Sequence, residues 1–330
     1  MSRPKREAVR SCCGVEVAMS SWPVPAETRV LAVANQKGGV GKTTTAVSLG
    51  AWLAIEGARV LLVDLDPQAN ATTGLGIDPR GPRPPGESIY HALLDGSSIF
   101  PCIRSTQLQN LRCVASSVDL AGAEVELVAL TSRELRLRRA LEAVMVEFDY
   151  LLIDCPPSLG LLTVNALAAA REVVVPIQCE YYALEGLGQL LTNLALVRAS
   201  LNPALRLAGI VLTMYDQRTR LSGEVADQVR AHFPDRVYRT IIPRSVRLSE
   251  APSFGRPIPL YDPGCRGSQA YRGLAWELVW EGRPPAAGPP MEQITGEQIT
   301  GEQITGEQIT GEQITGEQIT GELAEEGGRR

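Results

Sequence analysis

Two of the three lysines in this 330-residue chain fall within one glycine-rich stretch, NQKGGVGKTTT, at residues 35–45. They are Lys37 and Lys42, and every other strongly basic residue except Lys5 is an arginine. The stretch fits the phosphate-loop pattern G-x-x-x-x-G-K-[ST] except at its first position, where Gln36 replaces glycine. Glycines allow backbone N–H groups to converge on phosphate oxygens, and a lysine adds positive charge. The stretch therefore indicates phosphate binding, and it leaves the second lysine to be explained.

The sequence on both sides of the glycines supports this interpretation. Residues 29–35, RVLAVAN, are typical of a buried strand, and the residues from Thr43 onward are typical of a helix. Together they give the strand, loop and helix order of a phosphate loop. In such a loop we expect Lys42 to contact the β- and γ-phosphates and the Thr43 hydroxyl to ligate Mg²⁺. The alternative, a glycine-rich turn that binds no nucleotide, is disfavoured by this context.

Acidic residues end two further apolar runs. Asp154 closes YLLID, and Asp64 and Asp66 end LLVDLD. A carboxylate at the end of an apolar strand suits a group that holds the water shell of Mg²⁺. For Asp64 and Asp66, capping of a helix or a turn before Pro67 is the alternative. Neither histidine of the chain falls in these motifs, so phosphoryl transfer here would depend on positioning and charge rather than on a histidine base.

Short apolar runs alternate with stretches of helical length from residue 29 onward. The expected strands are residues 29–35, 58–66, 149–154, 171–178, 206–213 and 236–242. The expected helices are residues 42–56, 133–147, 160–170, 184–200, 221–233 and 268–281. This alternation predicts an α/β doubly wound, mostly parallel sheet with helices on both faces. Ligands of such a sheet bind at the carboxyl ends of its strands.

The two ends of the chain differ from this middle part. Residues 1–28 show no periodicity, and after a proline-rich linker the sequence EQITG is repeated six times from Glu292. A five-residue period maintains neither one helix face nor one strand face. We therefore expect a disordered extension at 1–28, a folded α/β domain at 29–281, and a disordered linker and acidic tail at 282–330.

Composition limits the classes of partner. The net charge is −5, of which residues 285–330 contribute −7 and residues 1–28 contribute +1, so the middle part is about +1. Between Arg198 and Arg256 there are ten arginines and five acidic residues, so a polyanion would meet this part. An ordinary solvated basic face is the open alternative. The chain has no long apolar run, no secretory pattern and no C-x-x-C pair among its seven cysteines, so we expect a cytoplasmic protein with reduced thiols and no membrane contact.

The spacing KGGVGKT resembles the deviant phosphate loop of the ParA/MinD ATPases, and nearly the whole globular length resembles the chromosomal ParA, or Soj, proteins. The segments that carry this resemblance are LLVDLDPQAN, YLLIDCPPSLG, IQCEYYALEGL, LTMYDQRTRLS and IPRSVRLSEAPSFG. The resemblance implies a ParA-type ATPase domain at 29–281 that uses ATP and Mg²⁺. It implies nucleotide contacts from Lys37, Gly38, Gly39, Val40, Gly41, Lys42, Thr43, Thr44, Pro243 and Ser245. Ser245 departs from the asparagine usual in IPRNVRLSE, so a shorter hydroxyl replaces an amide beside the adenine.

The resemblance also implies a role for the second lysine. In this family that lysine reaches across a dimer interface to the phosphates bound by the other subunit, which makes Lys37 the residue that couples dimerisation to nucleotide. It implies that Asp66 positions the attacking water. It further implies that Asp64 supports the magnesium side of the site, together with Thr43 and Asp154.

DNA and a protein partner follow from the same resemblance. Arg218 and Arg247 match arginines that bind DNA in Soj proteins, and Arg220 and Arg244 are further candidates. Since no helix-turn-helix segment precedes the ATPase domain, we expect nonspecific binding to double-stranded DNA on the nucleoid by an ATP-dependent homodimer. Hydrolysis is then expected to be slow until a ParB-type partition protein stimulates it.

Two other classes of function stay open at this point. A MinD-like, membrane-associated positioning ATPase would need a terminal basic amphipathic helix, whereas the repeat here is acidic and contains glycine. A metabolic relative, such as an iron–sulfur reductase or an arsenical pump ATPase, would need cysteines at cluster-like spacing, which the sequence lacks.

Overall fold

The computed structural model describes residues 22–81, 88–180 and 183–280, without the side chains of residues 183–185. The sequence before residue 22 and the expected linker and tail at 282–330 lie outside these described residues. Residues 22–28 are described, and the Trp22 side chain is buried in the core.

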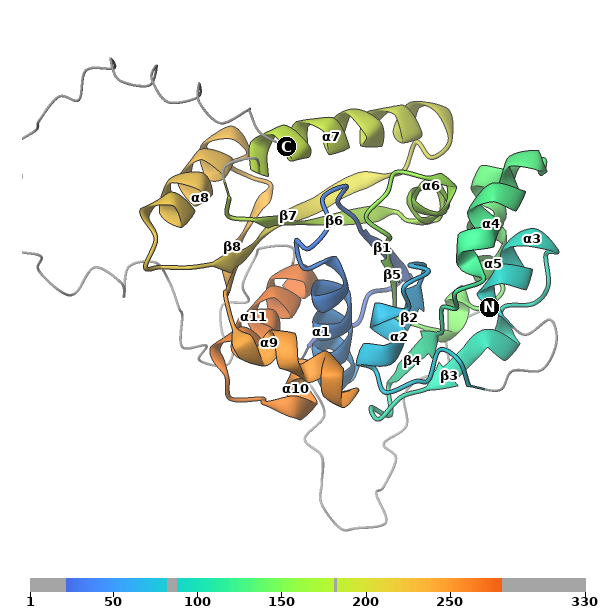
Figure 1. Ribbon diagram of the computed structural model, residues 1–330, viewed down its shortest axis with the longest axis horizontal. Coiled ribbons are helices and arrows are strands. Elements are labelled where there is room, and N and C mark those ends of the chain that lie inside the picture. The colour runs from blue at the N-terminus through green and yellow to red at the C-terminus, as the bar shows by residue number, and fades with distance from the viewer. Residues whose placement is uncertain (1–21, 82–87, 181–182, 281–330) are drawn as a thin grey trace, which may run out of the picture. The chain divides into compact units, whose positions relative to one another are not determined.

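Within the described residues, eight strands form one sheet in the order β3-β4-β2-β5-β1-β6-β7-β8 (Figure 1). They are β1 (Arg29–Val33), β2 (Val60–Asp64), β3 (Ile103–Ser105), β4 (Leu111–Val114), β5 (Tyr150–Asp154), β6 (Glu172–Gln178), β7 (Arg206–Tyr215) and β8 (Val237–Pro243). These strands pair in parallel, apart from the edge strand β3, which is antiparallel to β4. The six strands expected from the sequence are present with small differences at their ends, so the predicted fold class is confirmed.

Helices connect the strands and cover the sheet. The longer ones are α1 (Lys42–Ile55), α6 (Leu161–Ala169), α7 (Ala183–Ser200), α8 (Arg220–His232) and α11 (Arg266–Trp280). The shorter ones are α2 (Asn70–Gly74), α3 (Ile89–Leu94), α4 (Leu120–Glu126), α5 (Arg136–Glu142), α9 (Val246–Glu250) and α10 (Ile258–Tyr261). Single 3₁₀ turns are η1 (Phe100–Cys102), η2 (Leu127–Ala129), η3 (Arg133–Leu135), η4 (Met145–Glu147) and η5 (Ala251–Phe254).

The sheet is buried on both faces because helices pack against each of them. Figure 1 shows α6, α7 and α8 on one side of the sheet and α1 and α11 on the other. Alternate residues of β1 belong to the two resulting cores: Val30 and Ala32 pack with α6 and α7, while Leu31 and Val33 pack with α1 and α11. A strand buried on both faces has a nearly continuous apolar sequence, which is why its pattern was visible in the sequence.

The expected helix at 133–147 is interrupted, and a buried side chain explains the interruption. Only residues 136–142 are α-helical, with the turns η3 before them and η4 after them. In a continuous helix the Leu137 N–H would donate to the Arg133 carbonyl. Instead, Asn165 of α6 takes both groups: its Oδ1 accepts from Leu137 N at 3.1 Å, and its Nδ2 donates to Arg133 O at 2.8 Å. A side chain inserted into the helical ladder in this way breaks the helix.

The strand order places the candidate residues at one edge of the sheet. Strand β5 lies between β2 and β1, and its last residue, Asp154, pairs in register with Asp64 and with Val33. Because these strands are parallel, the loop that follows β1 and the two aspartates meet at the same carboxyl edge. Among the described helices, none has the length and apolar character needed to span a membrane.

Candidate active site

The glycine-rich loop joins β1 to α1 at the carboxyl edge of the sheet. Gly39 and Gly41 have φ angles of 75° and 86°, in the left-handed region that side chains with a Cβ rarely adopt. Helix α1 begins at Lys42, so the N–H groups of its first turn face the loop. Asn35 fixes the start of the loop, since its Nδ2 donates to a carbonyl of β6 at 2.7 Å and its Oδ1 accepts from Lys37 N at 2.9 Å.

The two lysines of the loop point to different places. Lys42 is only 6% exposed, and its Nζ donates to the Lys37 carbonyl across the loop at 3.0 Å. Burial lowers the pKa of Lys42, while the nearby carboxylates of Asp154 and Asp66 oppose this shift. The Lys37 side chain is 41% exposed, and its Nζ forms an ion pair with Glu180 at 3.0 Å. One lysine therefore faces the protein's own loop, whereas the other faces outward.

Thr213, two residues before the end of β7, links the glycine-rich loop to the neighbouring strands. Its buried hydroxyl lies 2.8 Å from the carbonyl oxygen of Val40 and 3.0 Å from that of Ile177 in β6. The sequence analysis did not single out this residue. The strand expected at residues 206–213 ends in this polar residue. The same kind of signal, a polar residue at the end of an apolar run, identified Asp154.

Asp64 and Asp154 are both fully buried and lie side by side on neighbouring strands. Burial raises the pKa of Asp64 to about 6, against three stabilising hydrogen bonds from Thr72 and the Asp66 backbone. Burial, followed by repulsion from Asp64, holds the pKa of Asp154 well above its usual range, and the neighbouring Thr43 hydroxyl and Lys42 oppose this rise. Two buried carboxylates in contact destabilise each other's charged form.

The residues at this edge fit a bound divalent cation. Neither oxygen of Asp154 has a hydrogen-bond partner in the described part of the chain, although a buried carboxylate ordinarily needs one. A cation beside Asp154 would satisfy those oxygens and relieve the repulsion from Asp64. The described residues contain no group of three or more His, Cys, Asp or Glu side chains able to hold a metal alone. Magnesium does not need such a group, since it is commonly held by one or two carboxylates together with substrate phosphates.

Asp66 follows β2 and lies beside the buried pair. Asp66 is only 6% exposed, and its Oδ1 accepts a hydrogen bond from Gln68 N at 2.9 Å. The Asp66 N–H donates to Asp64 Oδ1 at 3.2 Å. The connection after β2 is therefore held by the side chain of Asp64, and both sequence-predicted aspartates of this segment lie at the site.

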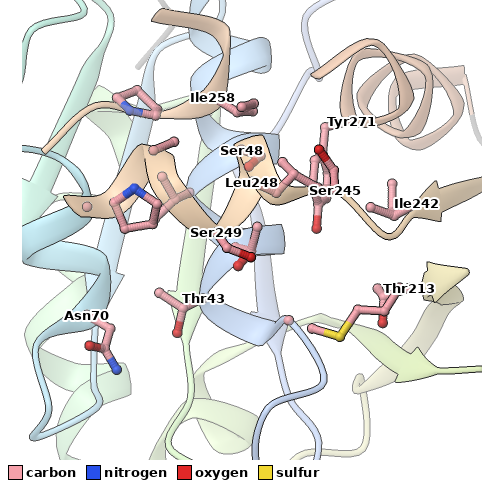
Figure 2. Close-up of a pocket in the computed structure, with 18 of the residues that line it drawn as sticks. Thr43, Ser48, Asn70, Thr213, Ile242, Ser245, Leu248, Ser249, Ile258 and Tyr271 are labelled. Atoms are coloured by element: carbon pink, nitrogen blue, oxygen red, sulfur yellow. The ribbon is translucent and has the colours of Figure 1, made fainter. Parts of the chain in front are cut away.

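A cavity of about 520 Å³ opens beside the loop (Figure 2). Its volume is within the range of small-molecule sites. The predicted nucleotide-binding residues that line it are Gly41, Thr43, Thr44, Pro243 and Ser245. Lys37, Gly38, Gly39, Val40 and Lys42 are not among the described lining residues, and they belong to the loop next to it. Tyr271 of α11 also lines the cavity; its hydroxyl lies 3.1 Å from that of Thr45, and the sequence analysis did not predict it.

Of the two arginines proposed for DNA, Arg218 lies on the loop after β7 and Arg247 lies in the short helix α9 after β8. These strands are neighbours, with Tyr215 paired to Pro243. The Arg218 side chain is 81% exposed and forms an ion pair with Asp216 at 2.7 Å, which lowers the pKa of Asp216 to about 2. Arg247 is 56% exposed and pairs with Glu250 at 3.1 Å. The structure therefore brings the two arginines to one edge, each with an acidic neighbour.

Three known proteins show what the chain is similar to. The sporulation initiation inhibitor protein Soj of Bacillus subtilis is 55% identical over 254 residues, which cover 77% of this chain and 99% of that protein. The chromosome partitioning protein ParA of Caulobacter vibrioides is 54% identical over 253 residues, covering 76% and 94%. The crystal structure of cobyrinic acid a,c-diamide synthase from Mycobacterium smegmatis with a bound ATP analog and magnesium has a TM-score of 0.67 and 42% identity, and the match covers 77% of this chain and 95% of that one.

The mostly parallel sheet, the glycine-rich loop after β1 and the aspartates on the adjacent strands together define a P-loop ATPase. A family model described as an AAA domain matches residues 28–207. Because relatives above half identity match along nearly their whole length, the chain belongs to the ParA/Soj family of chromosome-partitioning ATPases. ATPase activity follows from this membership, and the resemblance found in the sequence is confirmed.

Proposed function

We propose that the domain at residues 29–281 is an ATP-gated DNA-binding switch. ATP brings two copies together as a homodimer, the dimer binds double-stranded DNA without sequence preference on the nucleoid, and a ParB-type partner stimulates hydrolysis and release. The observation that carries this proposal is the outward direction of Lys37, since that lysine lies at the surface while Lys42 serves the loop itself.

If Lys37 bound the nucleotide of its own subunit, we would expect its side chain to point toward the loop, as that of Lys42 does. It points outward instead. The ion pair of Lys37 with Glu180 is exposed on both sides, at 41% and 48%. Exposed pairs of this kind contribute little free energy, about 0–1 kcal/mol. Lys37 can therefore exchange Glu180 for a phosphate group of a second subunit at small cost, whereas a buried pair would hold it in place.

The roles within one subunit follow from the positions of the side chains. Lys42 and the N–H groups of Gly38, Gly39, Val40 and Thr44 hold the phosphates, which is consistent with the loop geometry. Mg²⁺ would be held by Thr43 and Asp154, and Asp64 would support this side of the site by anchoring the connection after β2. The bound cation would neutralise charge that develops on the phosphate oxygens. Asp66 orients the attacking water. With no histidine at the site among the described residues, slow intrinsic hydrolysis is expected.

The adenine is proposed to lie in the cavity between the loop and the β8–α9 connection. Pro243 and Ser245 line that part of the cavity. Ser245 is the N-cap residue of α9, so its hydroxyl is near backbone groups that can also contact a base. The short side chain leaves more of the recognition to those backbone groups.

The arginines after β7 and β8 are proposed to contact the DNA backbone. Arg218, Arg247 and Arg244 are exposed, and Arg244 acts on the pKa of the same Asp216 that pairs with Arg218. Guanidinium groups bind phosphate well and carry no sequence information when they contact the backbone alone. A dimer presents two copies of this edge, so ATP-driven dimerisation increases DNA affinity by bivalency.

The test is the oligomeric state of Lys37→Ala. Light scattering is measured with ATP and with ADP, and nucleotide affinity is measured separately with a fluorescent ATP analogue. The proposal expects Lys37→Ala to bind ATP with nearly unchanged affinity and to stay monomeric in both nucleotides. The wild-type protein should dimerise with ATP only.

Gln36→Ala is the matched control, because it shortens the preceding side chain of the same loop without removing a charge. It should dimerise like the wild type. An ATP-dependent dimer of Lys37→Ala would show that the lysine does not act across the interface, and a monomeric wild type with ATP would overturn the dimer itself.

A further inference from the structure

A chain of hydrogen bonds behind the catalytic edge links Asp64 to Thr72, the third residue of α2. Thr72 is fully buried. Its N–H and its hydroxyl both lie 2.7 Å from Asp64 Oδ2, so both donate to the same oxygen. The other oxygen, Asp64 Oδ1, accepts from the Asp66 N–H. The carboxylate of Asp64 thus holds the two ends of the segment that contains Asp66.

The connection after β4 also holds the segment between Asp66 and Thr72. Ser116, just after β4, is fully buried. Its N–H donates to the Thr72 hydroxyl at 2.9 Å, and its own hydroxyl donates to the Asp66 carbonyl at 2.6 Å. The Asp66 N–H is therefore held by Asp64, whose carboxylate Thr72 fixes, and the Asp66 carbonyl is held by Ser116, which is distant in sequence.

The segment held in this way contains a strained residue. Ala69, directly before α2, has a φ of 54°, in the left-handed region that is unfavourable for residues other than glycine. Its N–H donates to the Asp66 carbonyl, the same oxygen that accepts from Ser116. A conformation of this kind persists only where surrounding contacts determine it, and such positions are concentrated at functional sites.

We propose that Thr72 and Ser116 are positioning residues for ATP hydrolysis, which hold the backbone of Asp66 so that its carboxylate stays aligned on the attacking water. The inference rests on the role proposed above for Asp66. Both side chains are fully buried, and their hydroxyls bond to Asp64 and to the Asp66 carbonyl, so neither is expected to contact the nucleotide. Their removal should therefore affect the chemical step and not nucleotide binding.

The central variant is Thr72→Val, which keeps the shape of the side chain and removes its hydroxyl. Misplacement of a catalytic group by a fraction of an ångström is costly, so we expect kcat for ATP to fall about tenfold with KM changed less than about twofold. Thr72→Ser restores the hydroxyl and should recover most of the rate. Ser116→Ala should give a smaller fall in kcat, because it removes only the bond to the Asp66 carbonyl.

Thr28→Val is the matched control for general destabilisation. The Thr28 hydroxyl also lies near two acceptors, the carbonyls of Met145 and Phe148 at 2.7 and 2.9 Å, but it precedes β1 at the opposite edge of the sheet. It should lower thermal stability about as much as Thr72→Val does while leaving kcat near the wild-type value. A similar kcat in the two variants would overturn the positioning role.

A double-mutant cycle with Asp66→Ala separates this inference from the proposed function. If Thr72 acts through Asp66, Thr72→Val should have no further effect on the residual rate of Asp66→Ala. Additive effects would contradict the inference while leaving Asp66 in its role. If Asp66→Ala hydrolyses ATP at the wild-type rate, the assignment of Asp66 fails first, and the inference fails with it.

Discussion

Two sets of charged groups lie at one edge of the sheet, one at the carboxyl ends of β1, β2 and β5 and the other after β7 and β8. Their surroundings differ. Lys42, Asp64 and Asp154 are each at most 6% exposed. Arg218 and Arg247 are 81% and 56% exposed. The first group is enclosed by the protein, while the second is surrounded by water.

This difference determines what a single substitution can do. A buried charge without its partner costs several kcal/mol, because water cannot replace the lost contact. An exposed ion pair is worth about 0–1 kcal/mol and exchanges partners readily. We therefore expect the buried group to show large, all-or-none effects on nucleotide chemistry, and the exposed group to show small effects on DNA binding that add together and depend on salt.

The largest effect is expected for Lys42→Ala. This change removes the charge that we propose lies against the phosphates, and truncating one partner of a buried charge contact costs about 2–5 kcal/mol. ATP affinity should fall about a thousandfold, which calorimetric titration would measure. Lys37→Ala serves as the comparison, since the Lys37 side chain points away from the loop and pairs with Glu180. Equal loss of affinity in the two variants would mean that both lysines serve the same nucleotide.

A smaller but still large effect is expected for Asp66→Ala. Removing the group that we propose orients the attacking water should lower the hydrolysis rate about a hundredfold and leave ATP affinity nearly unchanged, so the proposed ATP-bound dimer should accumulate on DNA. The rate of phosphate release with DNA and the ParB-type partner is the measurement. Asp78→Ala, at an exposed acidic residue of the same connection, should match the wild type. A wild-type rate in Asp66→Ala would exclude its assigned role.

The buried charged residues could be predicted from the sequence, whereas the hydrogen bonds that support them could not. Apolar strands that end in aspartate and a glycine-rich turn are local patterns, so the placement of Lys42, Asp64 and Asp154 was predictable. The hydrogen bonds of Thr72 with Ser116 join residues 44 positions apart, and no local pattern records such a pairing.

The same limit applies to the elements of the fold. Strands buried on both faces were predicted from their apolar runs. The edge strand β3 and its neighbour β4 are short and have exposed positions, and α2 and α9 have too few residues to show a helical period. The interruption of the helix at 133–147 depends on Asn165, whose side chain comes from another element. Only tertiary packing determines that contact.

The smallest effects are expected for the exposed arginines. Each phosphate contact contributes a slope of about −0.9 to the dependence of log affinity on log salt. Since a dimer carries two copies of each arginine, Arg218→Glu should reduce the magnitude of that slope by about 2 and weaken binding several-fold, and Arg247→Glu should behave similarly. Neither change should alter ATP-dependent dimerisation. The measurement is a salt titration on two unrelated duplexes, with ATP and with ADP.

Asp216→Asn should change DNA affinity in the opposite direction to the arginine substitutions. Arg218 donates two hydrogen bonds of 2.9 and 2.7 Å to Asp216, so DNA that binds Arg218 would have to displace this carboxylate. Removing the carboxylate charge should raise DNA affinity about twofold to threefold, as expected for an exposed ion pair, while Arg80→Glu, outside this edge, should change little. If Asp216→Asn weakened binding, the arginine would depend on its acidic neighbour for orientation. Strong preference for one duplex, or equal affinity with ATP and ADP, would refute nonspecific, ATP-gated binding at this edge.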